Sequence, residues 1–468
     1  MNAAAVNLNL VRQHRRLEHF RDMAHKEVDK LVDSLKEDLL SEQSLTIRQI
    51  SESFQEKKQG FLGELLEEFI QVHHQELFEQ GTASCPVCGK ELKKQADTPR
   101  TIETLLGASR ISRPYFYCRD CREGFFPVDE ALELSKRKKQ PDLQSLALEF
   151  LAEMPFERAS ELFQKATGIS FSDHRMHDLF ACFAEEATIE DIVPSCAEIE
   201  RRIAQASGSQ KRRPVLVVAT DGAHTPTRAA GGRDGKRGPG QYREAKGFRI
   251  YLLDKDDIVQ IASWHQIATA QEISKDLKIV AERIPTEKVR VCLIGDGASW
   301  LWRAMQEAFP GAREVLDYYH CSQHIHAVAQ LQYAEEPHKA LLWVESAMAR
   351  LSYKGGVSHV IGGLRRMQPK NAEVKELIRK TVNYLDKNKK RMNYRGARIG
   401  GYPFGSGGIE SANKFICHSR IKRSGAWWLE TNCNSMLKLR CSLVNGTFDE
   451  TFSQYVTRQK AKAFARST

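Results

Sequence analysis

Two Cys-x-x-Cys pairs constrain the fold of this chain more than any other feature. The first is Cys85 and Cys88 in "CPVCGKEL", and the second is Cys118 and Cys121 in "YCRDCREGFFP". Each pair presents two thiolates from a tight turn, and two such turns supply the four soft ligands of a tetrahedral zinc site. The residues between them alternate like a strand hairpin, which returns the second pair to the first. We therefore expect a zinc ribbon at 81–135 whose Zn²⁺ is structural, because four cysteines leave no coordination position open.

Length and composition favour several domains. A chain of 468 residues is too long for one ordinary core. No segment approaches the roughly 18 consecutive apolar residues of a membrane span, and the first residues lack the layout of a secretory signal. These features predict a cytoplasmic protein without a membrane partner. In that reducing compartment the eleven cysteines are expected to be free or metal-bound.

Basic residues are gathered in clusters along the chain. Lys and Arg number 70 against 60 Asp and Glu, so the formal net charge is +10. A basic surface can serve solubility alone, but these clusters flank the segments that carry the candidate sites, which favours a nucleic-acid partner. Residues predicted from the clusters to contact DNA are Lys236, Arg237, Arg420, Lys422 and Arg423.

Two helical regions surround the predicted ribbon. Residues 9–80 have apolar positions three and four apart and no proline, which predicts amphipathic helices in an N-terminal region at 1–80. Either dimerisation or plain packing would explain them. At 136–203, two short helices around Gly168 have the helix-turn-helix layout, whose second helix can enter a major groove and carries Arg175 on its polar side. A simple helical hairpin has the same pattern.

A change of periodicity follows a polar, basic stretch at 204–213, which we interpret as a linker. From residue 214 to 324 the pattern predicts three strands, a helix, a fourth strand, a second helix and a short fifth strand. This is the element order of an RNase H-like fold.

Acidic residues mark the ends of two predicted strands. "VVATDGAH" and "CLIGDGAS" both finish a buried run in Asp-Gly-Ala, at Asp221 and Asp296. Asp-Gly is a common turn start, but its repetition on the first and fourth strands favours a metal site, because neighbouring strands would bring both carboxylates to one edge. Glu410 in "GSGGIESANKF" is the third candidate; a glutamate serving the helix dipole is the alternative. Three carboxylates can hold two Mg²⁺ or Mn²⁺ ions for phosphoryl transfer.

These residues, with "YYHCSQHIH" downstream of Asp296, resemble the DDE transposases of bacterial insertion sequences in the Mutator-like group. The zinc ribbon preceded by helices resembles more narrowly the Kra/Lre-type branch. The resemblance extends from about residue 60 to 440. It implies a multidomain α+β protein with an RNase H-like α/β catalytic domain, preceded by the N-terminal helices, the ribbon and the helix-turn-helix. It further implies an all-helical insertion at 325–400 and a resumed core at 401–445. The termini match nothing in this family, and we expect residues 446–468 to form a basic tail.

The resemblance also implies a function. Such enzymes use the metal-bound triad to hydrolyse DNA at terminal inverted repeats and then join the freed 3′-hydroxyl to target DNA, as a homodimer or higher oligomer acting at the nucleoid. Cys321 and His324 match the Cys-x-x-His motif of this group, which implies active-site support; a packed cysteine and a polar histidine remain the alternative. A nuclease with the same triad but no strand transfer, or a domesticated non-catalytic DNA-binding protein, would share these features.

Overall fold

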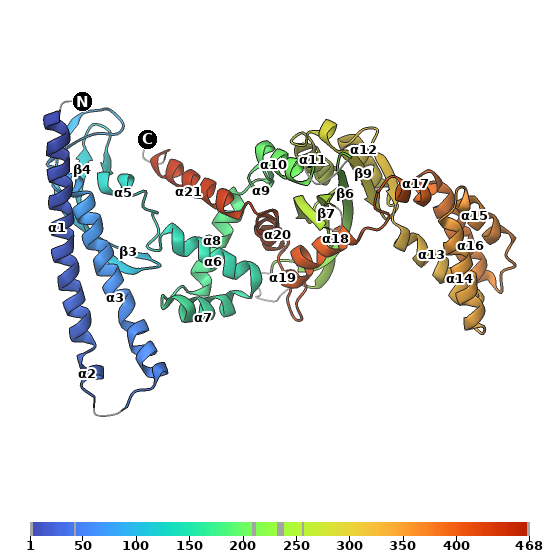
Figure 1. Cartoon of the computed structure of the whole chain (residues 1–468), viewed down its shortest axis with the longest axis horizontal. Coiled ribbons are helices and arrows are strands. Elements are labelled where there is room, and N and C mark those ends of the chain that lie inside the picture. Colours follow the sequence, from blue (N-terminus) through green and yellow to red (C-terminus); the bar gives the residue numbers. More distant parts are fainter. Residues whose placement is uncertain (1–2, 42–43, 208–211, 232–237, 255–256, 466–468) are drawn as a thin grey trace. The chain divides into compact units, whose positions relative to one another are not determined.

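The computed structural model describes residues 3–41, 44–207, 212–231, 238–254 and 257–465 (Figure 1). The fold is a mixture of helices and strands. The chain divides into two compact units, one formed by Met1–Phe183 with Phe452–Thr468 and the other by Ala184–Thr451. Within the described ranges, no helix combines the length and the apolar character needed to cross a membrane.

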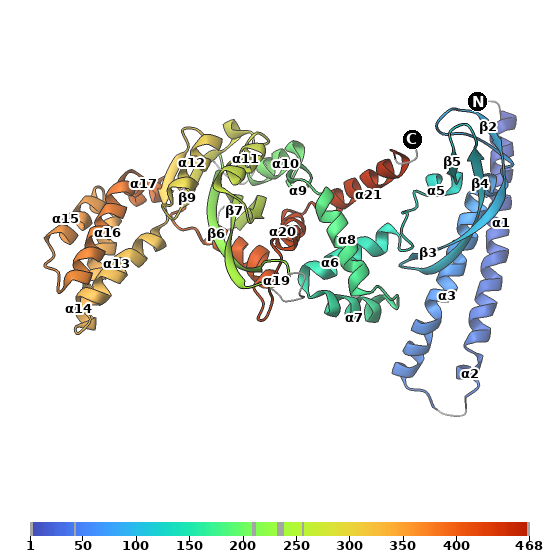
Figure 2. The same ribbon diagram turned by 180° about the vertical axis from the view of Figure 1, so that it is seen from behind.

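A helical hairpin begins the first unit. Its helices are α1 (Ala3–Ser34), α2 (Lys36–Leu39), α3 (Ile47–His73) and α4 (Gln75–Phe78). Helices α1 and α3 lie side by side in both views (Figures 1 and 2), and the Phe20 and Phe69 rings meet edge to face with centroids 5.4 Å apart. Thr46 starts α3 with a capping box, since its side chain accepts from the N–H of Gln49 and the Gln49 side chain bonds back. The helices predicted for residues 9–80 are therefore present.

Two small sheets follow the hairpin. Their strands are β1 (Thr82–Ser84), β2 (Glu91–Lys93), β3 (Ala96–Thr104), β4 (Gly107–Cys118) and β5 (Glu123–Phe125). β1 pairs with β2, and β3, β4 and β5 form an antiparallel sheet in that order. Burial alternates along β4, as expected for a strand with one face covered. A core of Ile70, Ile102, Ile111 and Val128 joins α3 to this sheet and to the helix that follows it.

Short helices complete the first unit. They are α5 (Pro127–Ala131), α6 (Pro141–Glu153), α7 (Phe156–Thr167), α8 (Asp173–Glu186) and most of α21 (Phe448–Ala465). Gly168 ends α7 in the left-handed conformation, with φ of 75°, which a side chain would disfavour. The predicted pair of helices around a glycine turn is thus observed.

The second unit opens with α9 (Ile189–Ile192) and α10 (Cys196–Ser207). Helix α10 includes residues 204–207, so the first part of the predicted linker is helical, and residues 208–211 lie outside the described ranges. The reason is that Ile199, Ile203 and Ala206 are buried at helical spacing. The polar residues between them occupy the exposed side of the helix.

A five-stranded mixed sheet forms the centre of the second unit. Its strands are β6 (Val215–Arg228), β7 (Gly240–Asp254), β8 (Asp257–Gln266), β9 (Arg290–Gly295) and β10 (Arg313–Leu316). Their order across the sheet is β10-β9-β6-β7-β8. β7 is antiparallel to both β6 and β8, whereas β9 runs parallel to β6 and β10 runs parallel to β9. Parallel pairing puts the carboxyl ends of β6, β9 and β10 at one edge.

Helices pack on both faces of this sheet. They are α11 (Ala270–Ala281), η1 (Thr286–Lys288), α12 (Ser299–Ala308), α18 (Gly407–Ala412), η3 (Asn413–His418), α19 (Ser419–Ile421) and α20 (Glu430–Asn445). The Thr220 hydroxyl contacts Met305 of α12, whereas Asp221 accepts a hydrogen bond from Asn413 of η3. Because successive strand residues point to opposite faces, α12 and η3 lie on opposite sides of β6.

Helices make up the segment between β10 and α18. They are α13 (Tyr318–Gln332), α14 (Pro337–Leu351), α15 (Gly356–Arg366), α16 (Ala372–Asn388), η2 (Lys389–Arg391) and α17 (Tyr394–Ile399), and α13 to α16 pack against one another (Figure 2). The chain returns to the sheet where the Tyr318 N–H donates to the Phe404 carbonyl, at 2.8 Å. The expected helical character of residues 325–400 is present.

Candidate functional site

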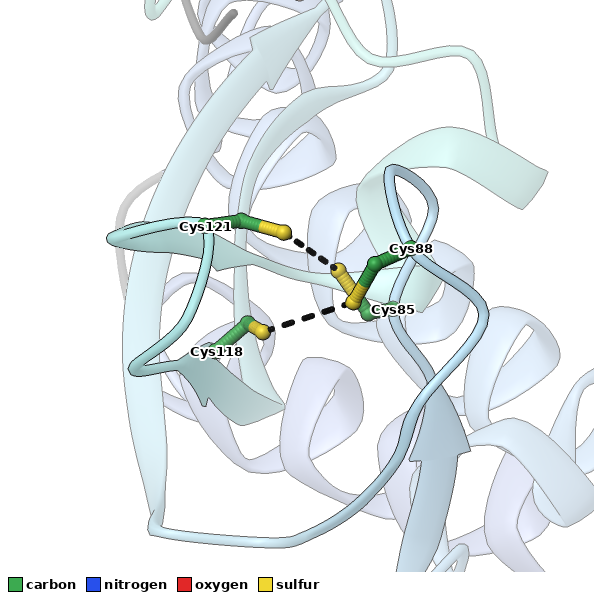
Figure 3. A group of neighbouring side chains, drawn as sticks. All are labelled: Cys85, Cys88, Cys118 and Cys121. Carbon is green, nitrogen blue, oxygen red and sulfur yellow. Dashed lines mark hydrogen bonds between the residues drawn. The ribbon is translucent and has the colours of Figure 1, made fainter.

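Four cysteine side chains converge at the end of the ribbon (Figure 3). Each offers a sulfur, and the four sulfurs all lie within 4.8 Å of one another. The Sγ atoms of Cys85 and Cys121 are 3.9 Å apart, and those of Cys88 and Cys118 are 3.8 Å apart. A tetrahedral zinc ion with Zn–S bonds of about 2.3 Å requires sulfurs about 3.8 Å apart. These cysteines therefore fit a structural zinc ion, as the sequence predicts.

Backbone groups prepare the first pair of cysteines for a metal. The Gly89 N–H donates to the Cys85 carbonyl at 2.9 Å, and Gly89 has a φ of 73°, so the chain turns back tightly after Cys88. Hydrogen bonds from this turn, above all from the backbone of Cys88, lower the pKa of the Cys85 thiol to about 7. A thiolate is the form that binds zinc, and the turn favours it.

The structure corrects the prediction that β6 ends at Asp221. The strand continues to Arg228, and Asp221 lies opposite Gly247 of β7. What ends near Asp221 is the parallel pairing with β9, whose last pair is Ala219 with Ile294. Asp221 therefore lies where β6 has stopped pairing with β9 but still pairs with β7. Gly222 is a strand residue and not a turn, because antiparallel pairing with β7 holds it extended.

Asp296 lies where the sequence predicts it. It follows the last residue of β9, and its Oδ1 accepts from the Ala298 N–H at 2.9 Å, which closes a tight turn. Gly297 in this turn has a φ of 103°, in the region that favours glycine. Since β9 is parallel to β6, Asp221 and Asp296 occupy the same edge of the sheet.

Glu410 reaches this edge from the first turns of α18. It is exposed, and its Oε1 accepts from the Ser406 hydroxyl at 3.1 Å. Ile409 and Ala412 of the same helix are buried, whereas Phe415, which the helical spacing predicts on the same apolar side, is 61% exposed because the turn there is π-helical. Arg249 of β7 donates to the Gly408 carbonyl at 2.6 Å and so ties the helix to the sheet.

The pKa of Asp221 responds to its burial and to the neighbouring carboxylates. Burial above all, together with the negative charges of Asp296 and Glu410, raises this pKa to about 6 against the opposing effects of the Gly222 N–H and His320. Among the described residues, the four cysteines form the only group of three or more metal-ligating side chains within 4.8 Å. The oxygens of the three carboxylates are therefore not all within that distance of one another. Carboxylate oxygens are the donors that hard divalent ions prefer.

Asp317 is a carboxylate at this edge that the sequence analysis missed. It follows β10, is fully buried, and starts α13 by accepting from the His320 N–H at 2.8 Å. Its other oxygen accepts from the backbone N–H of Ser406. Asp317 therefore connects the end of β10 to the start of the helix that carries Glu410. The available signal was an aspartate after a fifth short strand, at "REVLDYYH".

Cys321 and His324 take different positions on α13. Cys321 is fully buried, and burial raises the pKa of its thiol to about 12. The His324 ring packs on Tyr384 with centroids 4.1 Å apart, and the Tyr384 hydroxyl donates to the Asp296 carbonyl at 2.6 Å. His324 thus packs on the residue that bonds the Asp296 backbone, whereas Cys321 lies in the core.

The chain matches the model of a family described as "Uncharacterised protein family (UPF0236)" over residues 40–457. It belongs to this family. No curated protein matches it. Among solved structures it is similar to the "Drosophila P element transposase strand transfer complex", with 11% sequence identity and a TM-score of 0.24, over 66% of this chain and 80% of that one. A TM-score this low does not establish a shared fold.

The predicted DNA-contacting residues differ in exposure. Arg175 on α8, Lys422 and Arg423 are exposed. Arg420 is only 3% exposed, and its guanidinium lies 4.9 Å from the centre of the Trp428 ring. This burial corrects the prediction for Arg420, because a packed guanidinium cannot follow a phosphate backbone.

Two further predicted DNA contacts, Lys236 and Arg237, lie outside the described residues.

Proposed function

We propose that this protein is a DNA transposase whose active site consists of Asp221, Asp296 and Glu410. The observation that carries the proposal is that Asp221, just past the end of the pairing between β6 and β9, and Asp296, just after β9, lie at one edge of these parallel strands, where the charges of Asp296 and Glu410 both act on Asp221. Glu410 is 114 residues from Asp296 in sequence, since 410 − 296 = 114. Ordinary turn formation does not explain such convergence of like charges, which raises the free energy of the folded state.

The sheet order supports an RNase H-like catalytic domain. Three antiparallel strands lie beside two parallel ones, with the fourth and fifth strands of this sheet, β9 and β10, on the far side of the first, β6. This order accords with the expectation from sequence, and the helices between β10 and α18 accord with an insertion. The finer proposal, the Mutator-like group in its Kra/Lre-type branch, rests on the resemblance of the sequence motifs alone.

The three carboxylates would hold two Mg²⁺ or Mn²⁺ ions. Bound divalent ions lower the pKa of a nucleophilic water or hydroxyl and stabilise the leaving oxygen of phosphoryl transfer. The protein positions the carboxylates: β6 and β9 hold the aspartates, and Arg249 and Asp317 hold the α18 helix. The substrate is the DNA backbone, first at the element ends and then in the target.

DNA contacts outside the active site are assigned to exposed basic residues. Arg175 on the second helix of the helix-turn-helix would meet the element end, and Lys422 and Arg423 would follow the backbone close to α19. The zinc ribbon is a scaffold in this proposal. The active complex is a dimer or higher oligomer, since both ends of an element must be brought together.

A donor-plasmid excision assay tests the function. Asp296→Asn keeps the side-chain shape but removes the charge, and it should abolish excision while the purified variant still binds end DNA. Glu335→Gln, an exposed carboxylate that pairs with Lys370, is the matched control and should excise normally. Retained excision by the Asp296 variant would remove this residue from the active site.

The assay products separate the proposal from its alternatives. A transposase gives excised ends joined to new target DNA, whereas a nuclease gives cut ends alone. A domesticated DNA-binding protein gives neither, although it binds DNA. Sequencing of the products therefore distinguishes all three.

A further inference from the structure

Three residues lie in one row across neighbouring strands beside the candidate active site. Asp221 of β6 pairs with Gly247 of β7, and Gly247 pairs with His265 of β8. Side chains in such a row point to the same face of the sheet. Gly247 has no side chain, and the His265 ring lies over it, since a Cβ at Gly247 would be 2.2 Å from Cδ2 of that ring. A residue from another element lies in the space between the ring and Asp221.

Asn413 occupies that space. Its Nδ2 is 2.7 Å from Oδ2 of Asp221, and its Oδ1 is 2.9 Å from Nε2 of His265. A carboxylate only accepts hydrogen bonds, so the amide nitrogen must face Asp221 and the amide oxygen must face His265. His265 therefore carries its proton on Nε2 and donates it to Asn413. The hydrogen bonds run in one direction, from His265 through Asn413 to Asp221.

Burial keeps this chain of hydrogen bonds dry and the histidine neutral. His265 is fully buried and Asn413 is 5% exposed. Burial lowers the pKa of His265 to about 4, so the ring carries a single N–H at neutral pH. Its Nδ1 is buried without a hydrogen-bond partner in the described structure. A buried nitrogen without a hydrogen-bond partner lowers the stability of the folded protein. The ring nevertheless keeps this orientation, in which its other nitrogen bonds to Asn413.

The backbone around Asn413 is also unusual. Asn413 begins η3, a π-helical turn that directly follows the α18 helix of Glu410. Turns of this type occur mostly as single bulges in helices and frequently at functional sites. The same short segment thus presents Glu410 to the carboxylate edge and Asn413 to Asp221.

We propose that Asn413 is a positioning residue that holds the Asp221 carboxylate in its metal-binding orientation, and that His265 in turn holds the Asn413 amide. The inference rests on the proposed function, in which Asp221 is a metal ligand. The second oxygen of Asp221 is oriented by the Gly222 N–H, at 2.8 Å. With both oxygens held, the carboxylate loses little conformational freedom when it binds an ion. Groups that orient metal ligands in this way commonly change metal affinity about 10- to 100-fold when removed.

Gly247 gives an independent way to disturb the same contact. A Cβ at this position would lie 2.2 Å from Cδ2 of His265, closer than real side chains approach. Gly247→Ala therefore pushes the ring away from Asn413 without removing any hydrogen-bonding group.

Mn²⁺ binding to the full-length protein, followed by electron paramagnetic resonance, tests the proposal. The relevant signal is the Mn²⁺ that the wild type binds and the Asp221→Asn protein does not. Asn413→Ala and Gly247→Ala should each weaken it about 10-fold or more, and His265→Gln, which keeps an N–H donor, should bind more tightly than His265→Leu. Asn434→Ala is the matched control, because Asn434 bridges backbone groups of Ile267 with its amide, and it should leave the Mn²⁺ affinity unchanged.

The outcomes separate this inference from the proposed function. Unchanged Mn²⁺ affinity in folded Asn413→Ala and Gly247→Ala proteins overturns the positioning role, even where DNA cleavage is intact. Mn²⁺ binding that is the same in wild type and Asp221→Asn overturns it as well. A third outcome is that the wild type binds Mn²⁺ and the Asn413→Ala and Gly247→Ala proteins bind it more weakly, but the wild type does not cleave end DNA. This outcome supports the positioning role and rejects the transposase. If Asn413→Ala does not fold, Gly247→Ala and the two His265 variants decide.

Discussion

At the scale of single residues, Asp221 carries the most information about the site. It lies inside a strand, half enclosed by the sheet and η3, with two other carboxylates acting on it. A charge in this place lowers the stability of the folded protein, because burial and like charges both favour the protonated form. Buried carboxylates with raised pKa values are common at functional sites, so the destabilising charge of Asp221 favours a functional site here.

The raised pKa of Asp221 predicts that the stability of the folded protein depends on pH. The pKa of Asp221 is raised from 3.8 to about 6 in the folded protein, so the folded state binds the proton more tightly than the unfolded state does. Stability is then lost as the pH rises from about 4 to about 6. Asp221→Asn removes this loss but turns an amide N–H toward one of the two donors that hold the Asp221 oxygens, a cost that is the same at every pH. Its free energy of unfolding relative to wild type should therefore rise by up to about 3 kcal/mol between pH 4 and pH 7.

Urea unfolding at several pH values, without added divalent metal, measures this effect. Glu345→Gln, an exposed carboxylate on α14, controls for the loss of a negative charge. A stability gain for Asp221→Asn that is equal at pH 4 and pH 7 would contradict the assigned pKa.

Asp317 gives a second prediction at this scale. Both of its oxygens accept backbone N–H groups, from His320 and from Ser406. Asp317→Asn would turn an amide N–H toward one of these donors, which should cost about 1–3 kcal/mol. Excision should fall as well, because the contact anchors the segment that carries Glu410.

Thermal unfolding and the excision assay check the Asp317 variant together. Asn371→Ala is its control, since Asn371 caps α16 through the Val374 N–H but joins no separate element. It should lose stability and keep excision. Equal excision losses in both variants would show that Asp317 acts only through stability.

At the scale of elements, we expect the ribbon to depend on a bound metal. Its strands are three to twelve residues long, and short antiparallel strands with so small a core need a staple. The four sulfurs stand at zinc-compatible distances. A bound zinc ion therefore contributes directly to the folding of this element.

Cys118→Ser should release the zinc and unfold the ribbon. We expect about one zinc per chain in the wild type by atomic emission and almost none in this variant. Limited proteolysis should then cut within residues 81–135. Cys196→Ser, at an exposed cysteine outside the cluster, should keep the zinc. A metal-free wild type with an intact ribbon would refute the assignment.

At the scale of the whole molecule, a net charge of +10 favours binding to polyanions. Such binding weakens with salt, because each neutralised phosphate releases counterions. The structure separates basic residues that can take part from those that cannot. Lys422 and Arg423 are exposed, whereas Arg420 packs on Trp428.

Arg423→Ala should weaken binding to all DNA sequences alike and reduce the slope of log affinity against log salt by about 1. Arg420→Ala should instead lower the thermal stability with little change in that slope. Fluorescence anisotropy at several salt concentrations measures both slopes. A reduced slope for Arg420→Ala in the folded protein would restore it as a phosphate contact.

The sequence by itself determined what depends on local spacing. The Cys-x-x-Cys pairs, the order of strands and helices from residue 214 to 324 and the Asp-Gly turn at Asp296 follow from neighbouring residues, and the structure contains each of them. Hydrophobic periodicity and turn chemistry act over a few residues, so a single sequence records them.

Only the tertiary structure decided which distant groups meet. β6 continues past Asp221 because β7 pairs with it beyond the point where β9 stops, which no pattern within β6 reveals. Asn413 touches Asp221 across 192 positions of sequence, and Ser406 touches Asp317 across 89. Arg420 is buried because the Trp428 ring folds over it. Such contacts depend on how separate elements pack, and packing is decided by the whole fold and not by the residues on either side.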